Sequence, residues 1–236
     1  MATPYLGTGI LLADSSGPPP APAPRLCDTA GMRVPTPDPR SVASTLVLGS
    51  LAHFLLAAVA VQALRPEYDP WLAPLSLYLS GAWSAWLRAA YYGLALGIVL
   101  LALELRRTLE PRARYALVPV LLCGGALALA ATAAWPGPAP GYPVDDLEAL
   151  VHRIAAMAAF LLVGSGMLLQ SAALHRDPHW RGRALAALLL ALLAFAGLWL
   201  HALWRELPRG ASQKAVVALY LSWLWLCAWR LRTAPR

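Results

Sequence analysis

Four ionisable side chains lie inside apolar stretches that are long enough to cross a bilayer: His53, Arg88, His152 and His201. Such residues are costly in a membrane, so each is a candidate for function or for a specific structural partner. With a rise of ~1.5 Å per residue, Arg88, His152 and His201 lie within roughly two turns of one end of their stretches. These three are expected to share the outer half of the membrane, with His53 near the middle of its stretch.

These residue types could support binding or acid–base chemistry. Arg88 could hold an anionic group, and Asp145 and Asp146 lie at the mouth of the same region. His152 or one of the carboxylates could act as a general base or assist a metal-dependent hydrolysis, with His201 nearby. If the three helices pack together, the sequence predicts an outward-facing polar pocket.

Each of these residues also has a structural interpretation. Asp145 and Asp146 precede a predicted helix and suit its N-terminal cap and the positive end of its dipole. Arg88 could extend toward the interface or form an ion pair with one of the two carboxylates. His53 fits an interhelical hydrogen bond, which commonly joins membrane helices.

A bis-histidine haem site is a further alternative for His152 and His201. His53 has no facing partner, because His175 and His179 fall in a predicted inner loop. The three cysteines are too far apart for a zinc site or a disulfide framework. The sequence therefore predicts no bound metal and no resident cofactor.

The elements that must position these residues are membrane-spanning helices. Of the 236 residues, 59% are hydrophobic and 13% charged, against about 25% charged in an ordinary soluble domain. Backbone groups inside a bilayer must be paired internally, so apolar runs near ~20 residues predict helices. Gly93 and Gly97 fit close helix packing. We expect an all-α polytopic membrane protein, a bundle of six transmembrane helices, at 42–64, 82–105, 114–134, 149–173, 184–205 and 213–231.

The distribution of arginine predicts the orientation of the bundle. Most arginines lie in the N-terminal tail, the second and fourth loops and the C-terminus, which places those segments in the cytoplasm by the positive-inside rule. The abundance of Arg, Ala, Leu and Pro indicates a GC-rich, bacterial genome, and hence a bacterial inner membrane. A net charge of +7 without a basic block does not favour nucleic acid as a partner. Membrane lipids are the expected partners, and a homo-oligomer or another membrane protein stays open.

The first 40 residues differ from the rest in composition. They contain Pro18, Pro19, Pro20, Pro22, Pro24, Pro35, Pro37 and Pro39. Such a segment resists helix formation and buries too little apolar surface to fold. The chain is therefore divided into a disordered Pro/Ala-rich cytoplasmic tail at 1–40, a transmembrane domain at 41–232 and a short cytoplasmic end at 233–236.

Two stretches resemble a known family. The sequence Leu-Ser-Leu-Tyr-Leu-Ser-Gly at 75–81 enters the second span, and Trp135-Pro136 is followed by Asp145 or Asp146 and then His152. Both are similar to motifs of the bacterial domain-of-unknown-function family 998. The resemblance implies a six-helix integral membrane protein of unestablished activity. It marks Ser76, Tyr78, Gly81, Asp145 or Asp146, and His152.

Three functional hypotheses remain. The first is binding of a lipid headgroup or small anionic ligand in the outward polar pocket by Arg88, His152, His201, Ser76 and Tyr78. The second is a membrane-embedded hydrolase or transferase acting on lipid through His152 and either Asp145 or Asp146. The third is a structural membrane subunit whose polar residues only join helices.

Overall fold

The computed structural model describes residues 39–233, and within them it contains helices and loops but no strand. Its six long helices are those expected from the sequence, with ends that differ by up to four residues. The predicted disordered tail lies almost entirely outside the described residues, as does the end at 234–236. The helices are α1 (Pro39–Leu64), α2 (Ser84–Thr108), α3 (Leu117–Ala134), α4 (Asp146–Leu174), α5 (Arg181–Leu203) and α6 (Arg209–Thr233).

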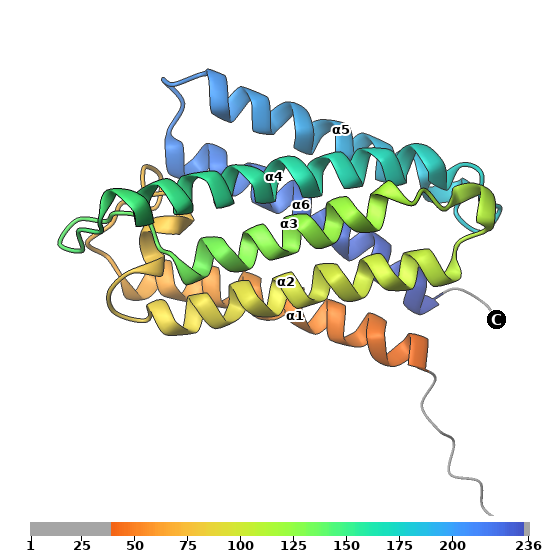
Figure 1. Cartoon of the computed structure of the whole chain (residues 1–236), viewed down its shortest axis with the longest axis horizontal. Helices are drawn as coiled ribbons and strands as arrows, with labels where there is room; N and C mark the ends of the chain where they lie inside the picture. The colour runs from red at the N-terminus through yellow and green to blue at the C-terminus, as the bar shows by residue number, and fades with distance from the viewer. Residues whose placement is uncertain (1–38, 234–236) are drawn as a thin grey trace, which may run out of the picture. The chain divides into compact units, whose positions relative to one another are not determined.

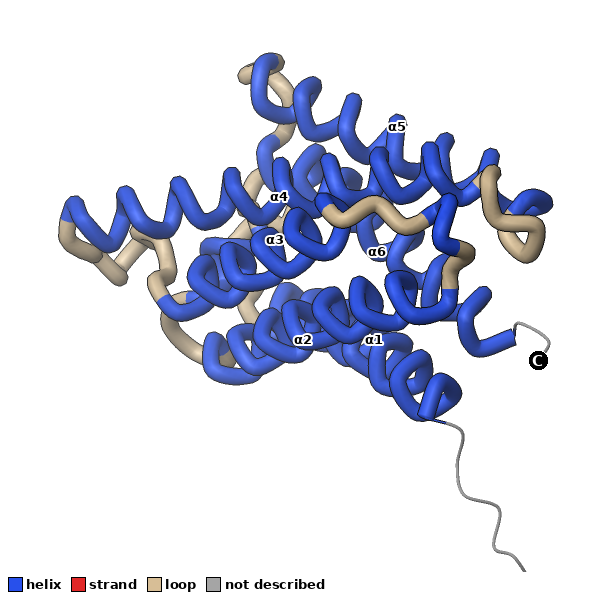
Figure 2. The backbone as a smooth tube through the Cα atoms, turned by 45° about the vertical axis from the view of Figure 1, so that its right-hand side comes forward, coloured by secondary structure: helices blue, strands red, loops and turns tan. Residues whose placement is uncertain are grey.

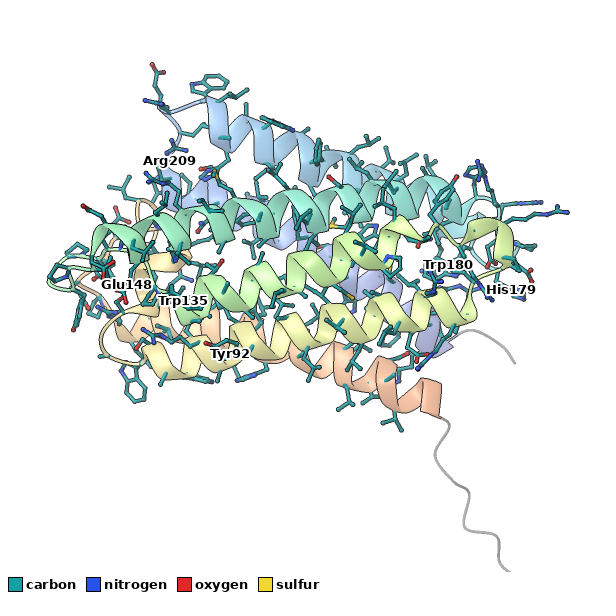
Figure 3. The ribbon with its side chains drawn as sticks, viewed as in Figure 1. Tyr92, Trp135, Glu148, His179, Trp180 and Arg209 are labelled. Carbon is teal, nitrogen blue, oxygen red and sulfur yellow. The ribbon has the colours of Figure 1, made fainter. Side chains whose placement is uncertain are left out.

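The six helices run alternately up and down, and each packs against the next in chain order (Figures 1 and 2). Helix α6 also packs against α1, which closes the arrangement into a ring. Figure 3 labels Trp135 at one end of the bundle and Trp180 at the other. The Trp135 end carries the loops at 65–83, 135–145 and 204–208, and the Trp180 end carries the loops at 109–116 and 175–180.

The outer surface of the bundle carries many large apolar side chains. On α3, Leu122 is fully buried whereas Leu127 is 73% exposed. Large apolar side chains are similarly exposed along the other helices. In water this surface would be unstable, but lipid tails solvate leucine as well as a protein core does. All six helices are long and apolar enough to cross a membrane, so the chain is a multi-pass membrane protein.

Glycine allows close contact between neighbouring helices. A Cβ at Gly97 would collide with the hydroxyl of Ser50 on α1, and a Cβ at Gly125 on α3 would collide with Val163 on α4. Gly93 lies opposite His53. Packing glycine against a neighbouring backbone is a common way to join helices in lipid. The close packing predicted for the Gly93 and Gly97 spacing is therefore found, between α2 and α1.

The loop at 65–83 contains a short 3-10 helix, η1 (Leu75–Leu79), that the sequence did not indicate. The loop is attached to the start of α6, where the side-chain Oε1 of Gln213 accepts a hydrogen bond of 2.8 Å from the Leu75 amide. The Ala211 amide donates to the Trp71 carbonyl at 2.9 Å. A second 3-10 helix, η2 (Pro111–Ala113), lies between α2 and α3.

Gly81 has a specific reason to be glycine. Its φ is +82°, in the left-handed region, and a Cβ there would lie 2.7 Å from the ring of Tyr142. The loops at 65–83 and 135–145 therefore touch at this position. Gly81 belongs to the motif that carries the family resemblance, and its role here is to let the two loops meet.

Candidate functional site

His152 lies in the second turn of α4 and closes the end of α3. Its Nδ1 is 2.8 Å from the Trp135 carbonyl and 3.3 Å from the Thr132 carbonyl. Carbonyls only accept, so Nδ1 carries the proton. The ring also packs over Gly137, where a Cβ would lie 2.7 Å from Cδ2 of His152. His152 thus satisfies carbonyl groups that the end of α3 leaves without helical partners.

Asp145 is the N-terminal cap of α4, as its sequence position suggested. Its Oδ1 accepts a hydrogen bond of 2.7 Å from the Glu148 amide. Asp146 is the first residue of the helix and is exposed. Both carboxylates lie at the positive end of the helix dipole, where negative charge is stabilised.

Arg88 is attached to the loop at 65–83. Its Nε donates a hydrogen bond of 2.9 Å to the carbonyl of Leu79, the last residue of η1. The ion pairs found among residues 39–233 do not include one between Arg88 and Asp145 or Asp146. The ion-pair hypothesis is therefore wrong for this structure, because a backbone carbonyl takes the place of the carboxylate.

His201 joins α5 to the start of α6. Its Nδ1 lies 2.8 Å from the Ser212 hydroxyl, and that hydroxyl donates to the Pro208 carbonyl at 2.8 Å. Arg209 donates to the carbonyl of His201 at 2.6 Å. Across the described chain, no hydrogen bond or ion pair joins any two of Arg88, His152 and His201. Each of the three residues joins a different pair of chain segments.

His53 makes the interhelical hydrogen bond that was predicted for it. The indole Nε1 of Trp86 on α2 donates to Nε2 of His53 on α1 at 3.1 Å. Trp86 belongs to the aromatic residues near the Trp135 end. This bond pairs Nε2 of His53 inside the membrane without any ligand.

A buried arginine that the sequence analysis did not select lies at the Trp135 end. Arg65 is 3% exposed; its Nη1 donates to the Ser80 carbonyl and its Nε to Glu67 at 2.7 Å. The guanidinium also lies 4.6 Å from the centre of the Tyr68 ring. Burial opposes its charge, but the bond to Glu67 and the Tyr68 contact outweigh burial, so the pKa of Arg65 is raised. Arg65 follows the last residue of α1, a position that resembles an ordinary interfacial arginine in sequence.

Tyr78, a predicted ligand-binding residue, is a core residue of η1. Its side chain is fully buried and meets Tyr68 edge-on, with ring centres 5.3 Å apart. Burial raises the pKa of its hydroxyl. Within the described part of the chain, that hydroxyl has no hydrogen-bond partner.

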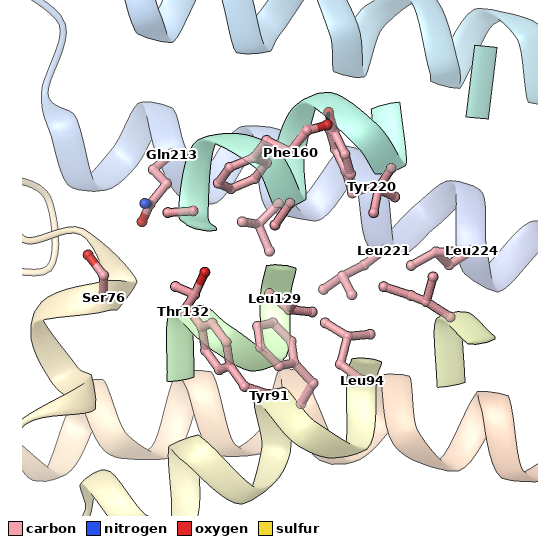
Figure 4. A pocket seen from close by; sticks show the side chains of 16 residues that line it. Ser76, Tyr91, Leu94, Leu129, Thr132, Phe160, Gln213, Tyr220, Leu221 and Leu224 are labelled. Carbon is pink, nitrogen blue, oxygen red and sulfur yellow. Dashed lines mark hydrogen bonds between the residues drawn. The ribbon is translucent and has the colours of Figure 1, made fainter. Parts of the chain in front are cut away.

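A cavity of about 90 Å³ lies between the helices (Figure 4). It runs from η1 at the Trp135 end toward the middle of the bundle. On α6 its lining residues run from Gln213 to Leu224, a rise of about 16 Å along the helix. Its lining comes from α1, α2, α3, α4, α6 and η1: Phe54, Ser76, Tyr91, Leu94, Ile98, Leu129, Thr132, Ala156, Ala159, Phe160, Val163, Gln213, Val217, Tyr220, Leu221 and Leu224.

The non-aromatic polar side chains of this cavity are gathered at one end (Figure 4), while the hydroxyl of Tyr220 further along donates to the Phe160 carbonyl at 2.8 Å. Figure 4 shows Ser76, Thr132 and Gln213 together, with Leu221 and Leu224 at the other end. Thr132 donates to the Ala128 carbonyl at 2.9 Å, while the amide nitrogen of Gln213 and the hydroxyl of Ser76 form no side-chain hydrogen bond to any described residue. No charged side chain of the described residues lines the cavity.

Of the predicted site residues, only Ser76 lines this cavity. Thr132 and Gln213 were missed, because single uncharged polar residues inside apolar runs are common and carry no distinctive spacing. In residues 39–233, no group of three or more His, Cys, Asp or Glu side chains could hold a metal ion.

Fold and lining together define a six-helix integral membrane protein with an amphiphilic central cavity. The chain belongs to the family described as Protein of unknown function (DUF998), whose model matches residues 47–230. The resemblance inferred from the motifs is therefore confirmed. A search of curated proteins and a search of solved structures found no significant match.

Proposed function

We propose that this protein binds an uncharged amphiphilic molecule such as a neutral lipid, with its polar head and the first few carbons of its chain in the central cavity of about 90 Å³. The polar head would lie at Ser76, Thr132 and Gln213, and the apolar tail would extend toward Leu221 and Leu224. The observation that carries the proposal is the polarity of the lining, with polar side chains at one end and apolar ones at the other.

The chemistry of the lining supports a neutral head. The anionic ligand predicted from the sequence would need a cation at the cavity, yet every lining side chain among the described residues is uncharged. The Ser76 hydroxyl and the Gln213 amide have donors to spare and could bond a hydroxyl, ester or amide. The apolar end of the cavity is the kind of space that stays empty of water and favours an apolar chain.

The cellular setting is proposed on the arginine distribution. We place the Trp180 end in the cytoplasm of a bacterium, because most arginines of the described residues lie at that end, in and beside the loops at 109–116 and 175–180. The head end of the cavity would then face the outer half of the inner membrane.

The test is to fill the cavity and measure what the protein retains. Ala156→Phe places a ring in the cavity, and Ala172→Phe places the same ring on the exposed side of the same helix. Lipids released from detergent-purified protein are identified and counted by mass spectrometry. We expect one neutral lipid per chain in the wild type and in Ala172→Phe.

In Ala156→Phe the bound lipid should be lost while circular dichroism shows the same helix content. Val217→Phe, on α6, should behave in the same way. Equal retention by the cavity variants and by Ala172→Phe would contradict the proposal. So would a wild-type protein that carries no lipid.

A further inference from the structure

A second feature with binding chemistry lies at the Trp180 end, far from the cavity's polar groups. An open groove of about 620 Å³ runs between the end of α2 and the start of α3. It is lined by Leu103, Arg106, Arg107, Arg114 and Ala116. Three guanidinium groups are thus gathered where two helices leave the membrane.

The three arginines differ in the hydrogen bonds and ion pairs that they already form within the protein. Arg107 pairs with Glu104, with Nη1 3.1 Å from Oε1. Arg114 is held by two carbonyls at the end of α2, those of Leu109 and Arg107. Arg106 forms no hydrogen bond or ion pair with any residue between 39 and 233, and it is exposed.

The groove also has an apolar side. Leu103, one turn before Arg106 and Arg107, is 38% exposed, and Leu117 at the start of α3 is 55% exposed. A molecule seated on the three arginines would therefore touch leucine on its membrane side. This combination suits a molecule with an anionic head and apolar tails, and a small water-soluble anion would leave the leucines unused.

We infer that this groove binds the phosphate headgroup of an anionic phospholipid. Arg106 supplies the free charge, and Arg114 offers a guanidinium already fixed in place by backbone carbonyls. Arginine binds phosphate oxygens through paired, directional hydrogen bonds. Basic pockets between membrane helices are suited to lipid phosphates, because the lipid's own position in the bilayer brings the phosphate to this depth. The inference is independent of the neutral ligand proposed for the central cavity.

The test uses the full-length protein, delipidated in detergent and titrated with dioleoylphosphatidylglycerol or dioleoylphosphatidylcholine. Native mass spectrometry reports the number of lipids bound. The key variant is Arg106→Gln, because the side chain has no partner whose loss would unfold the protein. Arg183→Gln is the matched control, since it removes one exposed arginine from the same end of the bundle but outside the groove.

The wild type should prefer phosphatidylglycerol, and Arg106→Gln should weaken its binding about five-fold, the effect of about one interfacial charge. Arg183→Gln should leave binding within a factor of two, and binding of phosphatidylcholine should be the same in all three proteins. Arg114→Lys, which keeps the charge but loses the planar donors, should also weaken binding.

Two results would overturn the inference. If Arg106→Gln and Arg183→Gln weaken binding equally, the protein attracts anionic lipid only through its overall positive charge. If glycerol phosphate displaces phosphatidylglycerol at equal concentration, the groove binds a free phosphate and the apolar side has no part in it.

Discussion

Arginine pairs backbone carbonyls at both ends of the bundle, but the groove at the Trp180 end also holds an arginine without such a bond. At the Trp135 end, His152 bonds the Trp135 carbonyl, Arg88 the Leu79 carbonyl and Arg65 the Ser80 carbonyl. At the Trp180 end, Arg114 bonds the Leu109 and Arg107 carbonyls in the same way, whereas Arg106 in the same open groove has no partner among residues 39–233. A charged residue within the membrane is therefore not by itself evidence of a ligand-binding site. A side chain with hydrogen-bond donors or acceptors that the protein leaves unpaired is better evidence.

The physical reason lies in the backbone. The last carbonyls of a helix have no partner within that helix, and lipid offers them none. The loop at 65–83 and the end of α3 leave several such groups near the membrane surface. Polar side chains at the Trp135 end are therefore used first to satisfy the backbone, and the ligand-binding capacity lies in the uncharged groups of the cavity.

Removal of Arg65 should give the largest loss of stability. Arg65→Met leaves the buried Ser80 carbonyl unpaired and breaks the contact with Glu67, at a cost of about 2–3 kcal/mol. Unfolding in mixed micelles by increasing dodecyl sulfate, followed by tryptophan fluorescence, measures this change. The exposed Arg205→Met is the control and should change stability by less than about 0.5 kcal/mol. Equal effects of the two variants would contradict a special role for the buried arginine.

Gly81→Ala should give the next largest effect. A left-handed backbone costs a residue with a Cβ about 1–2 kcal/mol, and the Tyr142 ring lies where the Cβ would be. The same unfolding assay applies. Adding Tyr142→Ala should recover only the part due to the collision. Unchanged stability of Gly81→Ala would show that the two loops do not meet as described.

Variants of His152 distinguish two roles for this residue: a structural cap at the end of α3 and a catalytic base. His152→Phe removes the donor to the Trp135 carbonyl and should cost about 1 kcal/mol. His152→Asn keeps a donor at the position of Nδ1 and should restore most of that stability. Both variants should retain the cavity lipid. If the two variants unfold alike, or if lipid retention fails in a folded His152→Asn, the capping role is contradicted.

The smallest expected effect is the pH dependence due to Glu67. The hydrogen bond from Arg65 lowers the pKa of Glu67 below its ordinary 4.5. The folded state therefore binds this proton less readily than the unfolded state, so the stabilisation is complete above about pH 5 and is lost as pH falls through the folded pKa. Glu67→Gln should flatten this part of the pH profile of stability. A profile identical to that of the wild type would argue against the Arg65–Glu67 pair.

The fold was predictable because the hydropathy pattern that indicates it is spread over many residues. Six runs near 20 apolar residues leave no alternative to helices in a bilayer, so their existence and order follow from hydropathy alone. The cap at Asp145 and the bond to His53 were also predictable, since each depends on local position. The loop at 65–83 was not, because η1 is held by Gln213 on α6, which is 138 residues from Leu75.

The residues that line the cavity were harder to predict from the sequence. Ser76 was identified through the family motif, but Gln213 and Thr132 come from different helices and have no common spacing. Their meeting depends on the closure of α6 onto α1 and on how α3 packs against α4. Charged residues attracted attention instead, and most of those at the Trp135 end proved to serve the backbone.

The most direct test of the central claim is photolabelling with a neutral monoacylglycerol that carries a diazirine on its acyl chain. The labelled residues are mapped by tandem mass spectrometry of the detergent-purified protein. Occupation of the cavity predicts labels on buried lining residues such as Leu94, Tyr220 and Leu224, in addition to lipid-facing ones. Labels confined to lipid-facing residues such as Leu127 and Leu189 would contradict a ligand in the cavity.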